Sequence, residues 1–152
     1  MQESCRGSVK MISLTKKIVE ELQEIFSQRE DSYNKTIIKE AYKELPKGQY
    51  PKIIVEEINN SEVFSRSTSQ GERTTNLSYQ ITAYSRDMEE YDYVDSVRFM
   101  MDIVNEYIAG KIAMRRLGDM AVKPYITDKT IMTCSQRYSC VYDKDMQLIY
   151  KS

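Results

Sequence analysis

The sequence predicts an α+β domain with two amphipathic helices packed on one face of a small antiparallel or mixed β-sheet. Three observations predict this fold class. Apolar residues recur at helical spacing in two separate segments. Alternating or β-branched segments stand between the two helices and again after the second. The chain has 152 residues, which fits one domain of ordinary size.

The N-terminal part predicts an extension followed by the first helix. Residues 1–12 show no apolar period and form the predicted extension, and residues 13–152 form the single domain. Met11 is a second candidate for the start of the protein. Ser13 is a residue type that caps helix N-termini. The apolar stripe of the first helix consists of Leu14, Ile18, Val19, Leu22, Ile25 and Phe26.

The middle of the chain mixes one ambiguous segment with two predicted strands. Apolar residues in segment 35–45 are spaced as in a short helix rather than a strand. The β-branched run 53–58 predicts a strand, and segment 77–84 alternates as a half-buried strand does. Between these strands, segment 61–75 is polar and predicts a long connection.

The second helix is the most clearly defined element. Its stripe consists of Val94, Val97, Met101, Val104 and Ile108. Acidic residues crowd its start, while Lys111, Arg115 and Arg116 follow its end, so both clusters oppose the helix dipole favourably. Gly110 is a candidate stop signal.

The remainder predicts sheet. Met132, Cys134, Tyr138, Cys140 and Tyr142 share one face of a strand, which Gln136 alone interrupts. Segment 143–145 then turns the chain into a closing hairpin strand at 148–150. On one strand the Cα atoms of Cys134 and Cys140 would lie roughly 20 Å apart, beyond disulfide reach. With Cys5, the odd cysteine count also argues against a disulfide framework.

Several kinds of chemistry are missing from the sequence. There is no histidine, which removes the commonest general base and the commonest zinc ligand. No C-x-x-C pair, Walker A sequence or G-x-G-x-x-G sequence occurs. The adjacent acids at Glu56-Glu57 and Glu89-Glu90 are typical of solvated surfaces. We therefore expect a protein that is not an enzyme and that holds no cofactor and no metal.

Charge and hydropathy bear on the partners. Lys plus Arg is 22 and Asp plus Glu is 23, so the basic excess of a dedicated nucleic-acid binder is missing. A helix-turn-helix interpretation of segment 15–45 fits poorly, because its connection is long and its second element carries Glu40 and Glu44. No apolar run is long enough to span a bilayer, so we expect no membrane partner and a cytosolic place of synthesis. A small cytosolic nucleic-acid-binding regulator is the alternative from a different functional class.

The succession of segments resembles one known family. A first amphipathic helix precedes the Tyr-Pro start of a strand at Gln49-Tyr50-Pro51-Lys52-Ile53-Ile54-Val55 and then a polar loop. Next come Leu77-Ser78-Tyr79-Gln80-Ile81-Thr82-Ala83-Tyr84 and a long helix. The chain ends with Arg137-Tyr138-Ser139-Cys140-Val141-Tyr142-Asp143 and Ile149-Tyr150. This order resembles the tail-terminator (tail-completion) proteins of long-tailed bacteriophages and related contractile phage-tail-like particles, over roughly residues 11–152.

The resemblance implies a closed ring of identical subunits, typically six, that caps the tail tube, ends its polymerisation and presents the surface for head, neck or collar attachment. The implied partners are further copies of the chain and the tail tube protein, with sheath and head or neck connector proteins as further candidates. Such a protein is made in the host bacterial cytoplasm and resides at the tail–neck junction of the particle. A head-completion or neck connector protein of the same particle is the alternative, because those families share the pattern. The extension 1–11 and the helical spacing of segment 35–45 depart from that pattern.

A ring needs two different adhesive surfaces on each subunit. The polar connection, taken as 61–76, is one candidate and carries Phe64, Arg66, Glu72 and Arg73. Arg115 and Arg116, facing the acidic start of a neighbour's second helix, form another; compensation of the helix dipole within one chain is the alternative for these charges. The 12 tyrosines, against 3 phenylalanines and no tryptophan, suit either a core with tyrosine as its main aromatic residue or sheet faces buried against neighbours.

Overall fold

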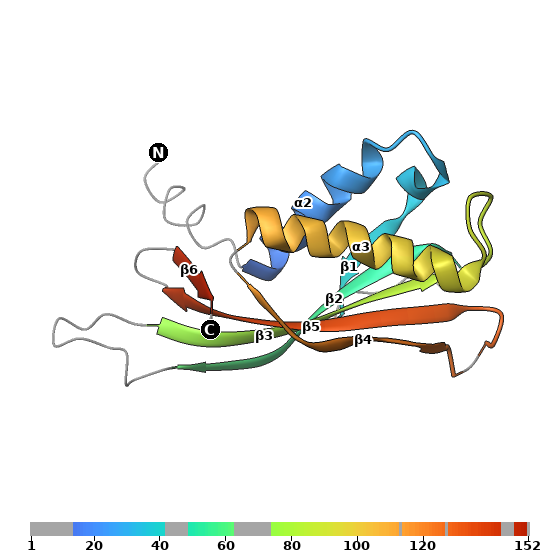
Figure 1. Cartoon of the computed structure of the whole chain (residues 1–152). Helices are drawn as coiled ribbons and strands as arrows, with labels where there is room; N and C mark the ends of the chain where they lie inside the picture. Colours follow the sequence, from blue (N-terminus) through green and yellow to red (C-terminus); the bar gives the residue numbers. More distant parts are fainter. Residues whose placement is uncertain are drawn as a thin grey trace, which may run out of the picture.

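The computed structural model describes residues 14–41, 49–62, 74–112, 114–126, 128–143 and 148–151. The elements are, in order, helix α2 (Leu14–Ser27), the 3-10 helix η1 (Ser32–Lys35), strands β1 (Ile37–Glu40), β2 (Lys52–Glu62) and β3 (Thr74–Ser85), helix α3 (Tyr93–Lys111), and strands β4 (Arg115–Pro124), β5 (Met132–Asp143) and β6 (Leu148–Lys151). Both helices lie on the same face of one sheet (Figure 1). The predicted α+β fold class is therefore confirmed.

The sheet has six strands in the order β1-β2-β3-β5-β4, with β6 beside β5. Strand β1 runs parallel to β2 and every other pair is antiparallel, so the sheet is mixed. The long strands β3 and β5 pair along their whole length, from Thr74 opposite Asp143 to Ser85 opposite Met132. Strands β4 and β6 share the outer edge of β5, since β4 pairs with its first part and β6 with its last.

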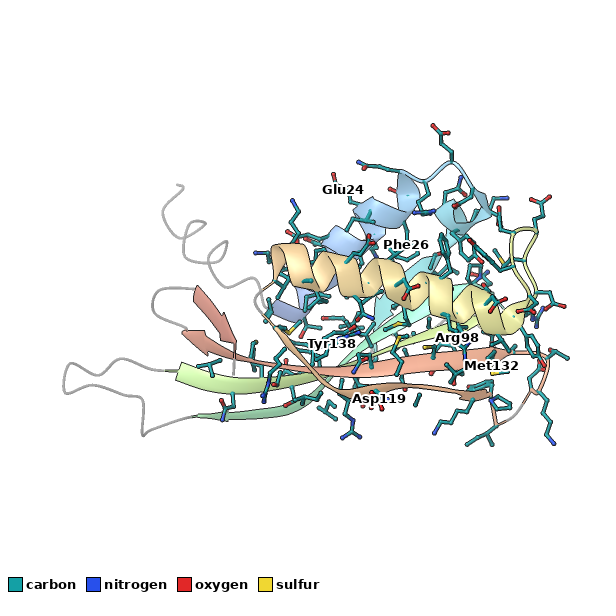
Figure 2. The ribbon with its side chains drawn as sticks, in the orientation of Figure 1. Glu24, Phe26, Arg98, Asp119, Met132 and Tyr138 are labelled. Carbon is teal, nitrogen blue, oxygen red and sulfur yellow. The ribbon has the colours of Figure 1, made fainter. Side chains whose placement is uncertain are left out.

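The core lies between the sheet and the two helices. Alternate residues of β3, namely Leu77, Tyr79, Ile81 and Ala83, are buried beneath the helices, as period-2 alternation requires. The predicted stripes of both helices pack against the sheet, with Ile25 and Val94 partly buried and the other stripe residues buried, which confirms both helix predictions. Figure 2 shows Tyr138 in the layer between α3 and β5, while Glu24 of α2 points away from the sheet.

The N-terminus of α3 is as predicted, but its C-terminus is not. The Asp92 carboxylate caps the helix by accepting a hydrogen bond from the Asp95 N–H at 2.9 Å. Gly110, the candidate stop signal, lies inside the helix, which continues to Lys111. The chain leaves the helix through Ile112 in an extended conformation, and the Ile112 N–H donates to the Ile108 carbonyl. The helix therefore ends without a left-handed glycine.

The prediction of a short helix at 35–45 is wrong. In its described part, Lys35 ends the 3-10 helix η1 and Ile37–Glu40 form strand β1, and residues 42–48 lie outside the described residues. Ile37 and Ile38 pair in parallel with Lys52 and Ile53 of β2, and Ile38 is buried beneath α2. The Gln23 side chain of α2 donates to the Ile38 carbonyl at 2.8 Å. Sheet pairing and the cover of α2 thus outweigh the local helical spacing.

The predicted connection 61–75 is wrong at both ends. Ser61 and Glu62 belong to β2 and pair with Asn76 and Thr75 of β3. Backbone hydrogen bonds build this part of the ladder, so it needs no apolar side chains. The predicted strands 53–58 and 77–84 are confirmed within longer ones, as are the long strand starting at Met132 and the closing strand β6. Strand β4 has no counterpart among the individually predicted strands.

Tyrosine serves as the principal aromatic residue of the core. Tyr33, Tyr79, Tyr107 and Tyr138 are buried, and each hydroxyl has a polar partner. Tyr33 donates to Ser96 at 2.8 Å, and Tyr79 shares a hydrogen bond of 3.0 Å with Thr15. Burial raises the pKa of Tyr79 and of Tyr138 above the ordinary tyrosine value. The core interpretation of the tyrosine surplus therefore holds for these four residues.

Candidate functional site

A groove of about 710 Å³ lies between the C-terminal half of α3 and the start of β4. Asp102, Asn105, Glu106 and Ala109 recur at i, i+3, i+4 and i+7 and so line it from one helix face. Its apolar part consists of Ile108, Ala109 and Met114, and Arg115 and Arg116 lie on the β4 side. The groove thus combines an apolar surface with two guanidinium groups and two carboxylates.

Hydrogen bonds hold Asn105, a partly buried residue that lines this groove. Tyr138 of β5 donates a hydrogen bond to the Asn105 side-chain oxygen, and the Asn105 amide donates to the Met120 sulfur at 3.7 Å. Arg115 and Arg116 themselves are exposed, and no ion pair joins them to a carboxylate in the described part of the chain.

An acidic turn, residues 87–92, precedes α3 at the other end of the helix. Three of its carboxylates serve the fold: Asp92 caps α3, Asp87 accepts from the Tyr93 N–H at 2.8 Å, and Glu90 accepts from Ser32 of η1. The hydrogen bonds from Ser32 hold the pKa of Glu90 below its ordinary value. Glu89 and Asp95 are exposed beside them. Folding thus concentrates negative charge on one surface.

The turn from β4 to β5 lies beside the acidic turn. The Tyr125 N–H donates to the Ile131 carbonyl at 2.9 Å, and the Asp128 carboxylate accepts from the Thr130 N–H and hydroxyl. Arg86, which immediately precedes the acidic turn, lies 3.9 Å from the Asp128 carboxylate. These hydrogen bonds hold the backbone of the turn, on which the Ile126 side chain is 93% exposed.

The groove and these two turns lie at opposite ends of the molecule. Helix α3 has 19 residues, which corresponds to a length of roughly 28 Å. The acidic turn adjoins its first residue and the groove its last turns. The acidic start of α3 therefore cannot reach Arg115 or Arg116 within one chain. Lys111 is the basic residue in the last turn of α3, and Arg115 and Arg116 follow at the start of β4, where they line the groove beside that turn.

The sheet face opposite the helices is open within the described structure (Figure 1). Short polar side chains cover its centre, and Arg137 donates to the Gln80 side chain at 3.3 Å. A depression of about 170 Å³ is lined by Tyr84, Tyr125 and neighbouring residues. Lys52 lies 4.8 Å from the centre of the Tyr50 ring and 5.4 Å from that of Tyr84. The Lys52 ammonium group therefore contacts two tyrosine rings of its own chain, those of Tyr50 and Tyr84.

The two described cysteines are buried in the core. Cys134 and Cys140 are free thiols on the same face of β5, as predicted. Burial raises the pKa of each thiol to about 11. A thiol that stays protonated at neutral pH is a poor nucleophile. Among the described residues, no group of three His, Cys, Asp or Glu side chains is placed to hold a metal ion.

The structure places only part of the predicted interface. Phe64, Arg66, Glu72 and Arg73 lie in segment 63–73, outside the described residues, so their role stays a prediction. Arg115 and Arg116 lie together at the start of β4, where they line the groove. Sequence reasoning missed Ile126 and the groove residues Ala109 and Met114. The sequence did carry a signal for Ile126. This apolar residue lies between Pro124 and the turn-forming Asp128 and belongs to no periodic apolar stripe, which is typical of an exposed turn position.

Comparison of the sequence with models of known protein families and with curated proteins finds no match. In the part of the chain that the structure describes, no helix is long and apolar enough to cross a membrane.

Proposed function

We propose that the chain is a structural ring subunit that caps the tube of a phage tail or tail-like particle. It ends tube polymerisation and forms the surface to which a head, neck or collar attaches. The order of elements in the sequence supports this proposal through its resemblance to tail-terminator proteins. Strand β1 adds support, because the family pattern has a strand where the local spacing suggested a helix.

One observation carries the ring part of the proposal. The two ends of the molecule carry different surfaces, with a groove lined by two arginines and two carboxylates at one end and an acidic turn beside exposed Ile126 at the other. A subunit with two different adhesive surfaces makes head-to-tail contacts, which close into a ring when the rotation between neighbours permits. A symmetric dimer would instead need one self-complementary surface.

The open sheet face gives the ring a further surface for other proteins. Its small polar side chains suit hydrogen-bonded contact with a broad partner such as the last ring of a tail tube. The proposal includes no catalytic step.

Removal of the protein from particle-producing cells tests the capping role. Without a terminator, tubes should grow past their normal length, and electron microscopy should show long tails of variable length that lack heads. Expression of the protein from a plasmid should restore a uniform length. Tails of normal, uniform length in its absence would contradict the proposal.

Cross-linking in purified particles separates this role from that of a neck connector. A terminator should yield cross-links to the tail tube protein, since it contacts the last tube ring directly. Cross-links to portal or collar proteins, with none to the tube, would favour the neck connector. A gel-shift assay at low salt, where non-specific binding is strongest, should show no retardation of nucleic acid and so exclude the regulator.

A further inference from the structure

Strand β4 forms one outer edge of the sheet (Figure 1). In the described structure it pairs with β5 on one side, and no strand pairs with its other side. The backbone N–H and C=O groups along such an edge can bond to a strand of another chain, which extends the sheet. With ten residues, a regular β4 would offer a long template for this strand addition. The backbone of β4 therefore decides whether the sheet can grow at this edge.

A bulge interrupts this edge. Leu117 pairs with Arg137 and Ala121 with Ser135, so four steps along β4 correspond to two steps along β5, and β4 carries two extra residues. Gly118 lies at the bulge with φ 72°, outside the strand region of backbone conformation. The ladder is thereby divided into two short runs, 115–117 and 121–124. A strand that approaches from outside meets a bent backbone rather than a regular row of donors and acceptors.

Gln136 of β5 holds this bulge from inside the sheet. Its side chain is 2% exposed and lies on the face that the helices cover, opposite Ile81 of β3. Its amide group donates to the Leu117 carbonyl and to the Gly118 carbonyl, each at 3.1 Å. Gly118 has no partner in the β4–β5 register, so a side chain here supplies a bond that the backbone ladder does not. This bond explains why a glutamine interrupts the apolar face of β5.

A glutamine also occupies the opposite edge of the sheet, which β1 forms. The Ile37 N–H donates to the Pro51 carbonyl at the start of β2, so the backbone polar groups of Ile38 point to the outer side. Gln23 of α2 donates to the Ile38 carbonyl at 2.8 Å and so takes an acceptor of a strand that has only four residues. Beyond the end of β1, strand β2 carries a bulge of its own. Both edges thus show features that oppose strand addition.

We infer that the edges formed by β1 and β4 are closed to strand addition, and that Gln136 with the β4 bulge is the principal stop. Other copies of the chain and partner proteins then contact the sheet through side chains on its faces and do not extend its ladder. This inference concerns how contacts are made and goes beyond the proposed function, since it holds for any partner.

Hydrogen exchange of the wild-type protein at low and at high concentration tests the inference, with native mass spectrometry of the same samples to report the assembled fraction. Peptides that contain β4 should exchange at the same rate in both samples, because no strand adds to the edge. Exchange over β4 that slows as the protein assembles would overturn the inference. A protein that assembles with β4 protected loses only this inference, whereas an open edge in a protein that caps no tail rejects only the proposed function.

Removal of the bulge should open the edge to pairing. Deletion of Gly118 and Asp119 makes the register with β5 continuous, since Met120 then lies opposite Gln136. Met120 already packs against the core, and Gln136→Leu removes the amide that has lost its acceptor. In sedimentation experiments this chain should self-associate at least about tenfold more strongly than the wild type. A folded variant that associates no more strongly contradicts the inference.

Gln136→Leu in the full-length chain tests the holding role without any deletion, and it decides the inference if the shortened chain does not fold. Peptides that cover residues 117–121 should exchange at least about tenfold faster than in the wild type, because two carbonyls lose their donor and the bulge loosens. The matched control is Gln80→Leu, at a glutamine of the central strand β3 that contacts Arg137. This control should leave the exchange over β4 unchanged. Equal exchange in Gln136→Leu and the wild type would overturn the role of Gln136.

Discussion

Tyr107 of α3 donates a hydrogen bond to the Glu21 carboxylate of α2 across 2.5 Å, and this contact joins the two helices that cover the sheet. Burial, and then the hydrogen bond to Glu21, raise the pKa of Tyr107 above the ordinary tyrosine value. The hydroxyl therefore stays a donor throughout the physiological pH range. The contact lies one turn of α3 before Lys111 and so supports the helix segment that lines the groove.

Tyr107→Phe should lower the free energy of unfolding by about 1–2 kcal/mol, because a hydrogen bond to a charged acceptor is lost while the ring stays in place. Glu21→Gln keeps an oxygen acceptor and should cost less than half as much. Urea denaturation of the two variants beside the wild type measures both effects. Equal stability of Tyr107→Phe and the wild type would show that the bond contributes nothing in solution.

Two glycines should respond in opposite directions to the same substitution. Gly118 lies at the β4 bulge with φ 72°, so Gly118→Ala forces alanine into the left-handed region and should destabilise by about 1 kcal/mol. Gly110 lies within α3, where Gly110→Ala should stabilise by about 0.5–1 kcal/mol. An added Cβ meets nothing within 4 Å at either position, so backbone conformation alone decides the sign. Thermal or urea unfolding that shifts in the same direction for both would contradict this assignment.

The buried thiols predict a loss of stability at alkaline pH. Each thiol has a pKa of about 11 in the folded protein and an ordinary, lower pKa when unfolded. Below about pH 8.5 both states are protonated and the full stability is present; as pH rises towards 11, the unfolded state alone ionises and gains. Each thiol should then remove about 2 kcal/mol by pH 10.5.

Cys140→Ala tests this prediction by removing one of the two titrations. The decline in unfolding free energy between pH 8 and pH 10.5 should be smaller in the variant than in the wild type. Titration of thiols with a coloured disulfide reagent provides a separate check, since no more than one thiol should react quickly in the native protein and all three in denaturant. Rapid reaction of three native thiols would contradict the burial of Cys134 and Cys140.

Periodicity predicted the elements that have one buried face. The stripe from Leu14 to Phe26 and the stripe from Val94 to Ile108 pack against the sheet, and the face of β5 that begins at Met132 packs against the helices. Their burial repeats with the period of the element, so the pattern is visible in one dimension. For the same reason the fold class followed from the order of these elements.

Strands β1 and β4 and the groove could not be predicted, because they depend on contacts between segments far apart in the sequence. Strand β1 has four residues and is defined by its parallel partner β2, which local spacing cannot reveal. Strand β4 is mostly exposed, and the bulge between Leu117 and Ala121 interrupts its alternation. The site followed the same rule: Arg115 and Arg116 stood out as charges, but the groove they line arises only when α3 and β4 are side by side.

The mass of the assembled protein in solution tests the central claim most directly. Native mass spectrometry at micromolar concentration should be recorded for the purified protein alone and mixed with the tail tube protein of the same particle. The account predicts a closed assembly of six identical chains, either alone or on the end of the tube. A particle that stays strictly monomeric under both conditions would contradict it.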